Sequence, residues 1–220
     1  MINSYGPDCI QALNLMNIGK FYELQQMYGM ALSAYNEAMQ IRIFFHGENH
    51  GLVADSLNSI GMVHNLQGNY RRAIEAYEKA QLTLTNTYGP DHLEIVTILE
   101  NLAISCQLKE CFQKGIEALL EAKRIKILRY GSDHYLVAQI WNTLGIFYTD
   151  HGCYKESLDA YKEVNRINIV VNGPDHPTLI NSWHNLGMAH QDQGNYKDAL
   201  EAYEEARRII LLNYNEHHFF

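Results

Sequence analysis

Apolar and small residues recur along this chain at helical spacing, three, four and seven residues apart, in stretches that come in pairs. In the clearest block, the first stretch contains Trp183, Leu186 and Gly187, and the second contains Ala199 and Tyr203. A Q-G-N segment separates the two stretches, and glycine directly after the last periodic residue is a usual helix stop. Each block therefore predicts two helices joined by a tight turn.

The block repeats with a fixed period of 42 residues. G-x-D-H or its variant G-E-N-H starts at Gly47, Gly89, Gly131 and Gly173, and an earlier copy at Gly6 is one residue short. Self-similarity at one period is the signature of a stacked repeat protein. We therefore predict one continuous domain over residues 1–220, with repeats at about 6–46, 47–88, 89–130, 131–172 and 173–214, and a C-terminal stub at 215–220.

Three packing details follow from the repeated positions. Small residues at one first-helix position should let the two helices of a pair approach closely: Gly61, Ala103, Gly145 and Gly187. Acidic or amide side chains of the G-x-D-H segments are expected to cap the first helices: Asn49, Asp91, Asp133 and Asp175. The tyrosines of the second helices are expected in the core, and Trp141 and Trp183 should be buried between the helices of their own repeats.

A W-x-x-L-G-x-x-Y…A-x-x-x-F/Y-x-x-A hairpin resembles the tetratricopeptide repeat (TPR). The 42-residue period, the leading G-x-D-H-P and the central Q-G-x-Y resemble the kinesin light chain type, over residues 6–214. The resemblance implies an all-α, right-handed solenoid of about five helix pairs that acts as a non-catalytic protein-interaction scaffold. The alternative is a sensing or self-association segment of a larger regulatory protein, such as a signalling ATPase with a repeat tail.

The composition narrows the partners and the compartment. A formal net charge of −8 argues against nucleic acid or an anionic membrane as the partner. No run of 18 apolar residues and no leader after Met1 are present, so we expect neither a membrane span nor a secretion signal. The four cysteines show no pairing pattern and are expected to be reduced, in the cytoplasm.

The two ends of the array lack the polar capping helix that terminal repeats usually need. The chain is therefore expected to be a piece of a longer array, and the alternative is a protein with degenerate end repeats. An excised array would expose an apolar face at each end, so weak self-association is expected.

Motifs for catalysis and cofactor binding are missing from the sequence, with no P-loop, G-x-S-x-G or H-E-x-x-H. A ladder of His50, His92, His134 and His176 is regular, but successive repeats lie ~10 Å apart, too far to share one metal ion. We therefore predict no enzyme, no cofactor and no metal site.

The candidate site lies on the first helices, beside the core positions, where a concave groove is expected in tetratricopeptide arrays. Amides and hydroxyls recur next to a row of methionine and isoleucine, which suits the backbone and side chains of an extended peptide. The candidate groove residues are Asn17, Lys20, Asn58, Ser59, Met62, Asn65, Asn101, Ile104, Asn142, Thr143, Ile146, His184, Asn185 and Met188. Because Lys20 is the one basic residue among them, a neutral or basic peptide is expected in preference to an acidic one.

Overall fold

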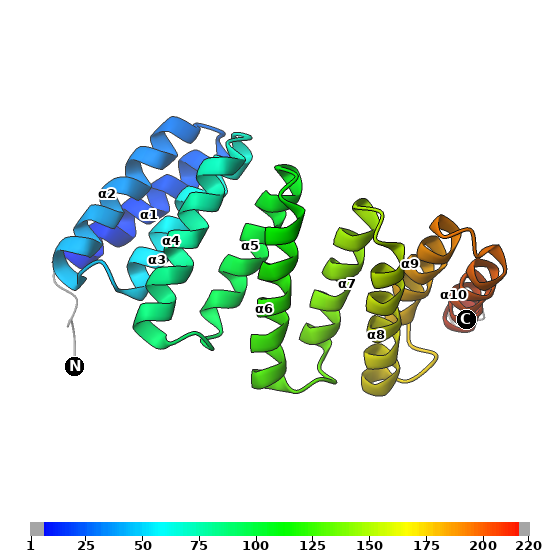
Figure 1. Cartoon of the computed structure of the whole chain (residues 1–220). Coiled ribbons are helices and arrows are strands. Elements are labelled where there is room, and N and C mark those ends of the chain that lie inside the picture. The colour runs from blue at the N-terminus through cyan, green and yellow to red at the C-terminus, as the bar shows by residue number, and fades with distance from the viewer. Residues whose placement is uncertain (1–6, 216–220) are drawn as a thin grey trace. The chain divides into compact units, whose positions relative to one another are not determined.

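A computed structural model describes residues 7–215, and this part of the chain consists of helices with no strand. The helices form five successive pairs (Figure 1). Their bounds are α1 Pro7–Leu24, α2 Tyr28–His46, α3 Gly51–Leu66, α4 Tyr70–Tyr88, α5 Glu94–Leu108, α6 Phe112–Tyr130, α7 Tyr135–Asp150, α8 Tyr154–Asn172, α9 Thr178–Asp192 and α10 Tyr196–Asn215. The all-α repeat fold is thus confirmed, and every second helix begins at an aromatic residue, Tyr or Phe. The predicted stub lies, apart from Asn215, outside the described residues.

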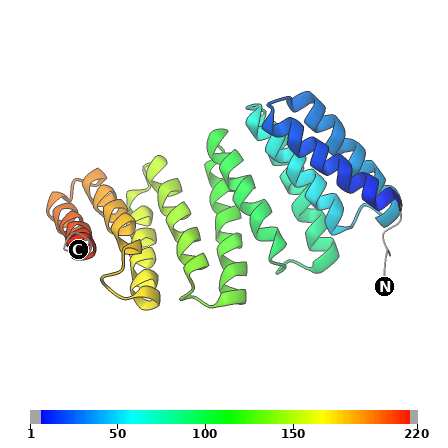
Figure 2. The same ribbon diagram turned by 180° about the vertical axis from the view of Figure 1, so that it is seen from behind.

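Two compact units make up the chain, Met1–Ala122 (unit 1) and Lys123–Phe220 (unit 2), and the division falls within α6. In unit 1 the helices α1 to α5 pack in sequence, each against the next. In unit 2 the helices α7 to α10 do the same. Figure 2 shows the helix pairs of each unit from behind. The single domain over residues 1–220 stays a prediction.

The two helices of a pair approach closely at a glycine, as the sequence predicts. A Cβ atom added to Gly61 would lie 2.6 Å from the ring of Tyr77, and one added to Gly145 would lie 2.6 Å from the ring of Tyr161. Both tyrosines are buried. Because ordinary carbon–carbon contacts are about 3.5–4.0 Å, the tyrosine ring occupies the volume that a larger residue would need.

The turn between paired helices requires a left-handed backbone. Gly68, Gly152 and Gly194 have φ values of +74°, +72° and +79°. In the other two pairs the same position is held by Gln26 and Glu110, with φ values of 59° and 63°. Glycine adopts this conformation freely, whereas other residues have a steric cost there.

The predicted aspartate caps are wrong, because histidine takes that role. The imidazole Nδ1 of His50 accepts a hydrogen bond from the amide of Leu52 at 3.2 Å, and His134 does the same for Leu136 at 3.2 Å. The same contact is longer at His92, 3.4 Å, and at His176, 3.3 Å. His50 and His134 are therefore the N-caps of α3 and α7, while His92 and His176 accept from the second residue after them without being the N-cap residue.

The surroundings of His50 disfavour its charged form. Burial lowers its pKa, and the neighbouring His46 and Arg42 act in the same direction, while Asp55 opposes them. An imidazolium at this position would also lose the Nδ1 lone pair that caps the helix.

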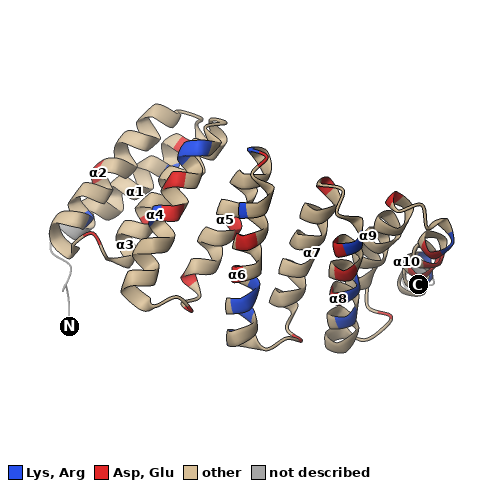
Figure 3. Cartoon of the chain, viewed as in Figure 1, with Lys and Arg blue, Asp and Glu red and all other residues tan. Residues whose placement is uncertain are grey.

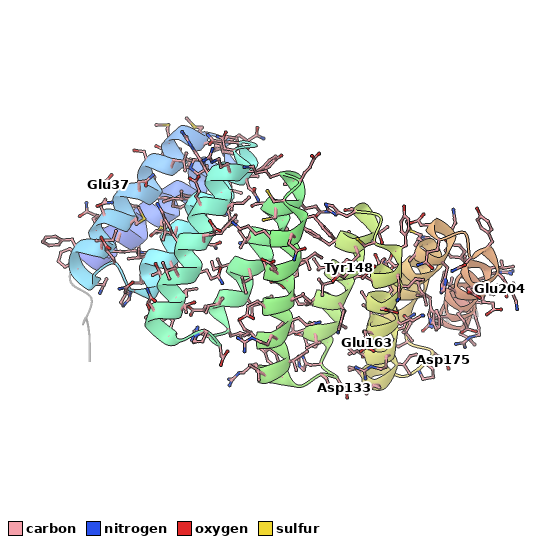
Figure 4. The ribbon with its side chains drawn as sticks, viewed as in Figure 1. Glu37, Asp133, Tyr148, Glu163, Asp175 and Glu204 are labelled. Atoms are coloured by element: carbon pink, nitrogen blue, oxygen red, sulfur yellow. The ribbon has the colours of Figure 1, made fainter. Side chains whose placement is uncertain are left out.

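The aspartates of the G-x-D-H segments instead accept hydrogen bonds from arginines of the second helices. Arg166 donates to Asp133 at 2.7 Å and to Glu163 at 3.0 Å. Arg208 makes the equivalent bond to Asp175 at 2.6 Å. Figure 4 labels Asp133, Glu163 and Asp175 in unit 2. The connections that lead into α7 and α9 are thus tied to the second helix of their own repeats.

The tryptophans are half-buried, so the expectation that they are buried within their own repeats is wrong. Trp183 packs against a cluster that includes Leu158 and Tyr161 of the preceding helix α8. Trp141 carries the ammonium group of Lys123 over its ring, 3.8 Å from the centroid. Trp183 therefore contacts the preceding repeat, whereas Trp141 packs against Val137, Ala138 and Ile167 of its own repeat and has Lys123 of α6 over its ring.

Candidate functional site

Asparagines of successive first helices bind one another in both units. In unit 1 the Nδ2 of Asn101 donates to the Oδ1 of Asn58 at 2.9 Å. In unit 2 the Nδ2 of Asn185 donates to the Oδ1 of Asn142 at 3.0 Å. The sequence analysis placed these four residues in the groove but not in direct contact.

Each amide pair keeps hydrogen-bonding capacity after its mutual bond. A primary amide has two N–H donors and an oxygen with two lone pairs. In the Asn142–Asn185 pair, the amide nitrogen of Asn142 and the oxygen of Asn185 take no part in the mutual bond. The pair therefore presents one donor group and one acceptor group, which are the two groups of a peptide bond.

A groove of about 780 Å³ in unit 2 contains this amide pair. It lies among α7, α8 and α9, and none of its lining residues carries a charge. Five of them are asparagines, and the others are mostly hydroxyl or amide residues. The full lining is Tyr135, Ala138, Gln139, Asn142, Thr143, Val164, Asn168, Asn172, Thr178, Asn181, Ser182 and Asn185.

The sequence analysis found part of this groove and missed the rest. Of the candidate residues, Asn142, Thr143 and Asn185 line it, whereas Asn168 and Asn172 of the second helix α8 were not considered. Their signal was present in the sequence, because two asparagines one helical turn apart follow each other on one side of α8. They were missed because the search was restricted to the first helices.

The predicted apolar row lies outside the lining of this groove. Ile104, Ile146 and Met188 are exposed on α5, α7 and α9, while Met62 is partly buried. Each exposed residue lies three residues, close to one helical turn, after a polar residue of the same helix. Ile104 follows Asn101, Ile146 follows Thr143 and Met188 follows Asn185. The row therefore continues the first-helix surface beyond the amides.

The remaining candidate residues have local partners. Ser59 and Thr143 donate their hydroxyls to carbonyls of their own helices, both at 3.1 Å. Asn65 accepts from Ser105 at 2.9 Å. The ring of His184 lies 5.5 Å from that of Tyr203, and the side chain of Asn17 is exposed.

The one candidate cation is neutralised within its own helix. The Nζ of Lys20 lies 2.6 Å from Glu23, whose other oxygen accepts from the Tyr35 hydroxyl at 3.0 Å. This contact raises the pKa of Tyr35, after the larger effect of burial. Lys20 therefore offers little net charge to an acidic partner.

The described part of the chain has no metal-binding cluster and no helix that could span a membrane. No group of three or more His, Cys, Asp or Glu residues among residues 7–215 has the arrangement to hold a metal ion. No helix in this range is long and apolar enough to cross a membrane. Cys106, Cys111 and Cys153 are free thiols, and the side chain of Cys9 lies outside those that the structure describes.

The family comparison and the structural comparison point to the same kind of repeat. The tetratricopeptide repeat family matches residues 8–81, 61–110, 94–168 and 136–210. TPR-like repeats of kinesin light chain type from Podosopora anserina superpose with a TM-score of 0.80 at 19% identity, covering 94% of this chain and 98% of theirs. BtubC (BKLC) from P. vanneervenii gives 0.79 at 18% identity, with 97% and 84% coverage.

A third solved structure is YrrB, "a TPR protein with an unusual peptide-binding site", with a TM-score of 0.59 at 18% identity, covering 90% of this chain and 86% of that one. A comparison with curated protein sequences gives no match. At these identities the solved structures bear on the fold, while the family match spans almost the whole chain. The chain belongs to the tetratricopeptide repeat family, and its repeats are similar to those of kinesin light chain-like proteins.

Proposed function

We propose that this protein is a non-catalytic interaction scaffold and that the groove among α7, α8 and α9 binds an extended, uncharged stretch of a partner polypeptide. The observation that carries the proposal is the lining itself, in which amides and hydroxyls surround about 780 Å³ without a charged side chain. Membership in a family of repeat scaffolds supports protein interaction as the kind of function.

The amide pair accounts for recognition of the main chain. An extended peptide presents a carbonyl acceptor and an N–H donor at each residue. The free amide nitrogen of Asn142 suits the carbonyl, and the free oxygen of Asn185 suits the N–H. Each such bond contributes a net ~0.5–1.5 kcal/mol, so two of them change affinity by about one order of magnitude or more.

The lack of charge in the groove selects against ionised side chains. An unpaired charge that leaves water for a site with no counter-ion carries a large desolvation cost. Outside the groove the net charge of −8 repels acidic partners and attracts basic ones over a distance of about 10 Å. We therefore expect a peptide whose central residues are uncharged, with basic residues tolerated on either side.

The test is binding of three peptide libraries of equal length, with uncharged, basic-flanked and acidic sequences. Binders are then titrated by calorimetry against the unchanged protein and against Asn142→Ala combined with Asn185→Ala. We expect the double variant to bind about tenfold or more weakly, at unchanged helix content by circular dichroism.

The matched control is Asn36→Ala. Asn36 is an exposed asparagine of α2, in unit 1, whose Nδ2 bonds to the carbonyl of Leu32 at 2.7 Å. It should bind like the unchanged protein. Equal affinities of the groove variant and this control would remove the groove from the mechanism, and selection of acidic peptides would contradict the charge argument.

A further inference from the structure

The first helix of the chain leaves open a surface that every later repeat buries. Ile18 is 44% exposed and Phe21 is 59% exposed. Residues at the equivalent positions of α3 in unit 1, Ile60 and Val63, are 7% and 0% exposed because α2 packs on them. We call the α1 surface that contains Ile18 and Phe21 the head face.

The last helix leaves open the matching surface. Leu200 of α10 is 59% exposed, whereas Leu158 at the equivalent position of α8 is 6% exposed. Leu158 and Tyr161 are buried by Leu186 and Ala189 of the next helix, α9. We call the α10 surface that contains Leu200 and Tyr203 the tail face.

The two faces are the two halves of the contact that joins repeats inside each unit. Leu200 and Tyr203 stand 42 residues after Leu158 and Tyr161, so the tail face repeats the α8 side of the α8–α9 cluster. Ile18 and Phe21 stand four periods before Leu186 and Ala189, so the head face repeats the α9 side. We propose that the tail face of one copy of this chain docks on the head face of a second copy, and so continues the repeat contact between molecules.

The low charge and the exposed apolar residues around the head face favour a protein as its binding partner. The helices α1 and α2 carry little charge, whereas α4 carries several charged residues (Figure 3). The α1–α2 pair also exposes Leu24, Met27 and Met30. Several exposed apolar side chains on one helix pair with little charge favour a docking site over an ordinary solvated surface.

Polar residues in the head face make the contact weaker than the one inside a unit. Gln11 and Asn14 are exposed at positions where α9 has the buried residues Leu179 and Ser182. Arg207 of the tail face is exposed where α8 has the buried Asn165. The association is therefore reversible and depends on concentration.

A head-to-tail contact has a distinctive consequence for assembly. Because the two faces differ, each new copy leaves one head face and one tail face open, so growth does not stop at a dimer. A symmetric dimer formed through the head faces alone would stop at two copies. The two arrangements are therefore separable by experiment.

The test is sedimentation velocity of the 220-residue chain from about 1 μM to about 1 mM, with head variant Phe21→Glu, tail variant Leu200→Glu and control Leu212→Glu. Leu212 is 47% exposed, and its equivalent in α8, Val170, is 61% exposed, so neither belongs to the contact. The unchanged chain and the control should form species larger than dimers. Each face variant alone should associate at least about tenfold more weakly, because a charge would be buried unpaired.

An equimolar mixture of the head and tail variants decides the arrangement. Each variant keeps one intact face, so the mixture should form dimers and nothing larger. A monomeric unchanged chain at every concentration would overturn the proposal, and so would a mixture that stays monomeric. Loss of association in the head variant alone would show a symmetric dimer instead. Circular dichroism establishes that each variant is folded.

Discussion

Replacing Gly145 with alanine should destabilise the protein because Tyr161 occupies the space of the new methyl group. The added Cβ would lie 2.6 Å from Cε1 and 2.7 Å from Cζ of the tyrosine ring. Overpacking of this kind typically costs about 1–3 kcal/mol. Alanine in place of glycine within a helix returns about 1 kcal/mol. The net loss of stability should therefore be up to about 2 kcal/mol.

The same chain shows which second change should remove the clash. In the third repeat the position of the glycine is held by Ala103, and the position of the tyrosine is held by Leu119, which is fully buried. In a Tyr161→Leu background, Gly145→Ala should therefore become stabilising by about 1 kcal/mol, since only helix propensity remains. The coupling energy of the double-mutant cycle should be about 1–3 kcal/mol.

Urea denaturation, followed by circular dichroism, measures the free energy of unfolding of the unchanged protein, the two single variants and the double variant. The dependence of that free energy on urea concentration should be compared among the four proteins, because repeat arrays can lose two-state behaviour. Gly29→Ala is the control, because a Cβ there meets no atom within 4 Å. It should be neutral or stabilising. Gly145→Ala could instead change the free energy of unfolding equally in the presence of Tyr161 and in the Tyr161→Leu background. That result would mean that the tyrosine ring does not exclude a methyl group at residue 145.

Three further changes test other parts of the structure. Glu110→Gly should stabilise the protein by about 1 kcal/mol by relieving its left-handed backbone, φ 63°, whereas Glu117→Gly within α6 should destabilise it by a similar amount, measured by urea midpoints. The lowered pKa of His50 means that its contribution to stability is present above about pH 6.5 and is lost as the pH falls through the folded-state pKa. His50→Asn keeps a cap without titrating, so it should lose less stability than the unchanged protein between about pH 7.5 and 5, and an equal loss would contradict the histidine cap. Asn165→Met should raise the urea midpoint, because the buried Asn165 amide has no hydrogen-bond partner among the described residues and the equivalent residue in α2 is Met39; a midpoint lowered by the change would mean that the amide is satisfied.

The helix pairs could be predicted because the same residues recur at one period. Five copies of one pattern average out local ambiguities, and the second helices α2, α4, α6, α8 and α10 start at a 42-residue spacing, at Tyr28, Tyr70, Phe112, Tyr154 and Tyr196. The glycine–tyrosine contact was also within reach, since Gly61 and Gly145 occur with tyrosine sixteen residues later, while Ala103 occurs with Leu119.

The helix caps could not be assigned from composition alone. In each G-x-D-H segment, aspartate and histidine are adjacent, and both side chains can accept a hydrogen bond from a helix amide. The connection directs Asp133 toward Arg166, which leaves His134 as the cap. One signal would have helped: where Asn49 replaces the aspartate, Leu82 replaces the arginine 33 residues later, so the two positions change together.

The groove was only half predictable because it depends on positions that vary among the repeats rather than on the residues that recur. Asn168 lines the groove, and its position differs from repeat to repeat: Leu84 of α4 is 2% exposed and belongs to the core, whereas α2 and α6 have the charged residues Arg42 and Lys126 there. A helix pair can lack the apolar contact that Leu84 makes only where neighbouring contacts still hold the helices together. Leu158 and Leu186 provide such contacts between α8 and α9. Positions that are the same in every repeat therefore specify the fold, whereas positions that vary among the repeats, such as that of Asn168, are where the surface of one helix pair differs from that of the others. By this reasoning Asn168→Leu should leave the helix pairs intact and weaken peptide binding, whereas Leu158→Asn should disrupt the stack itself.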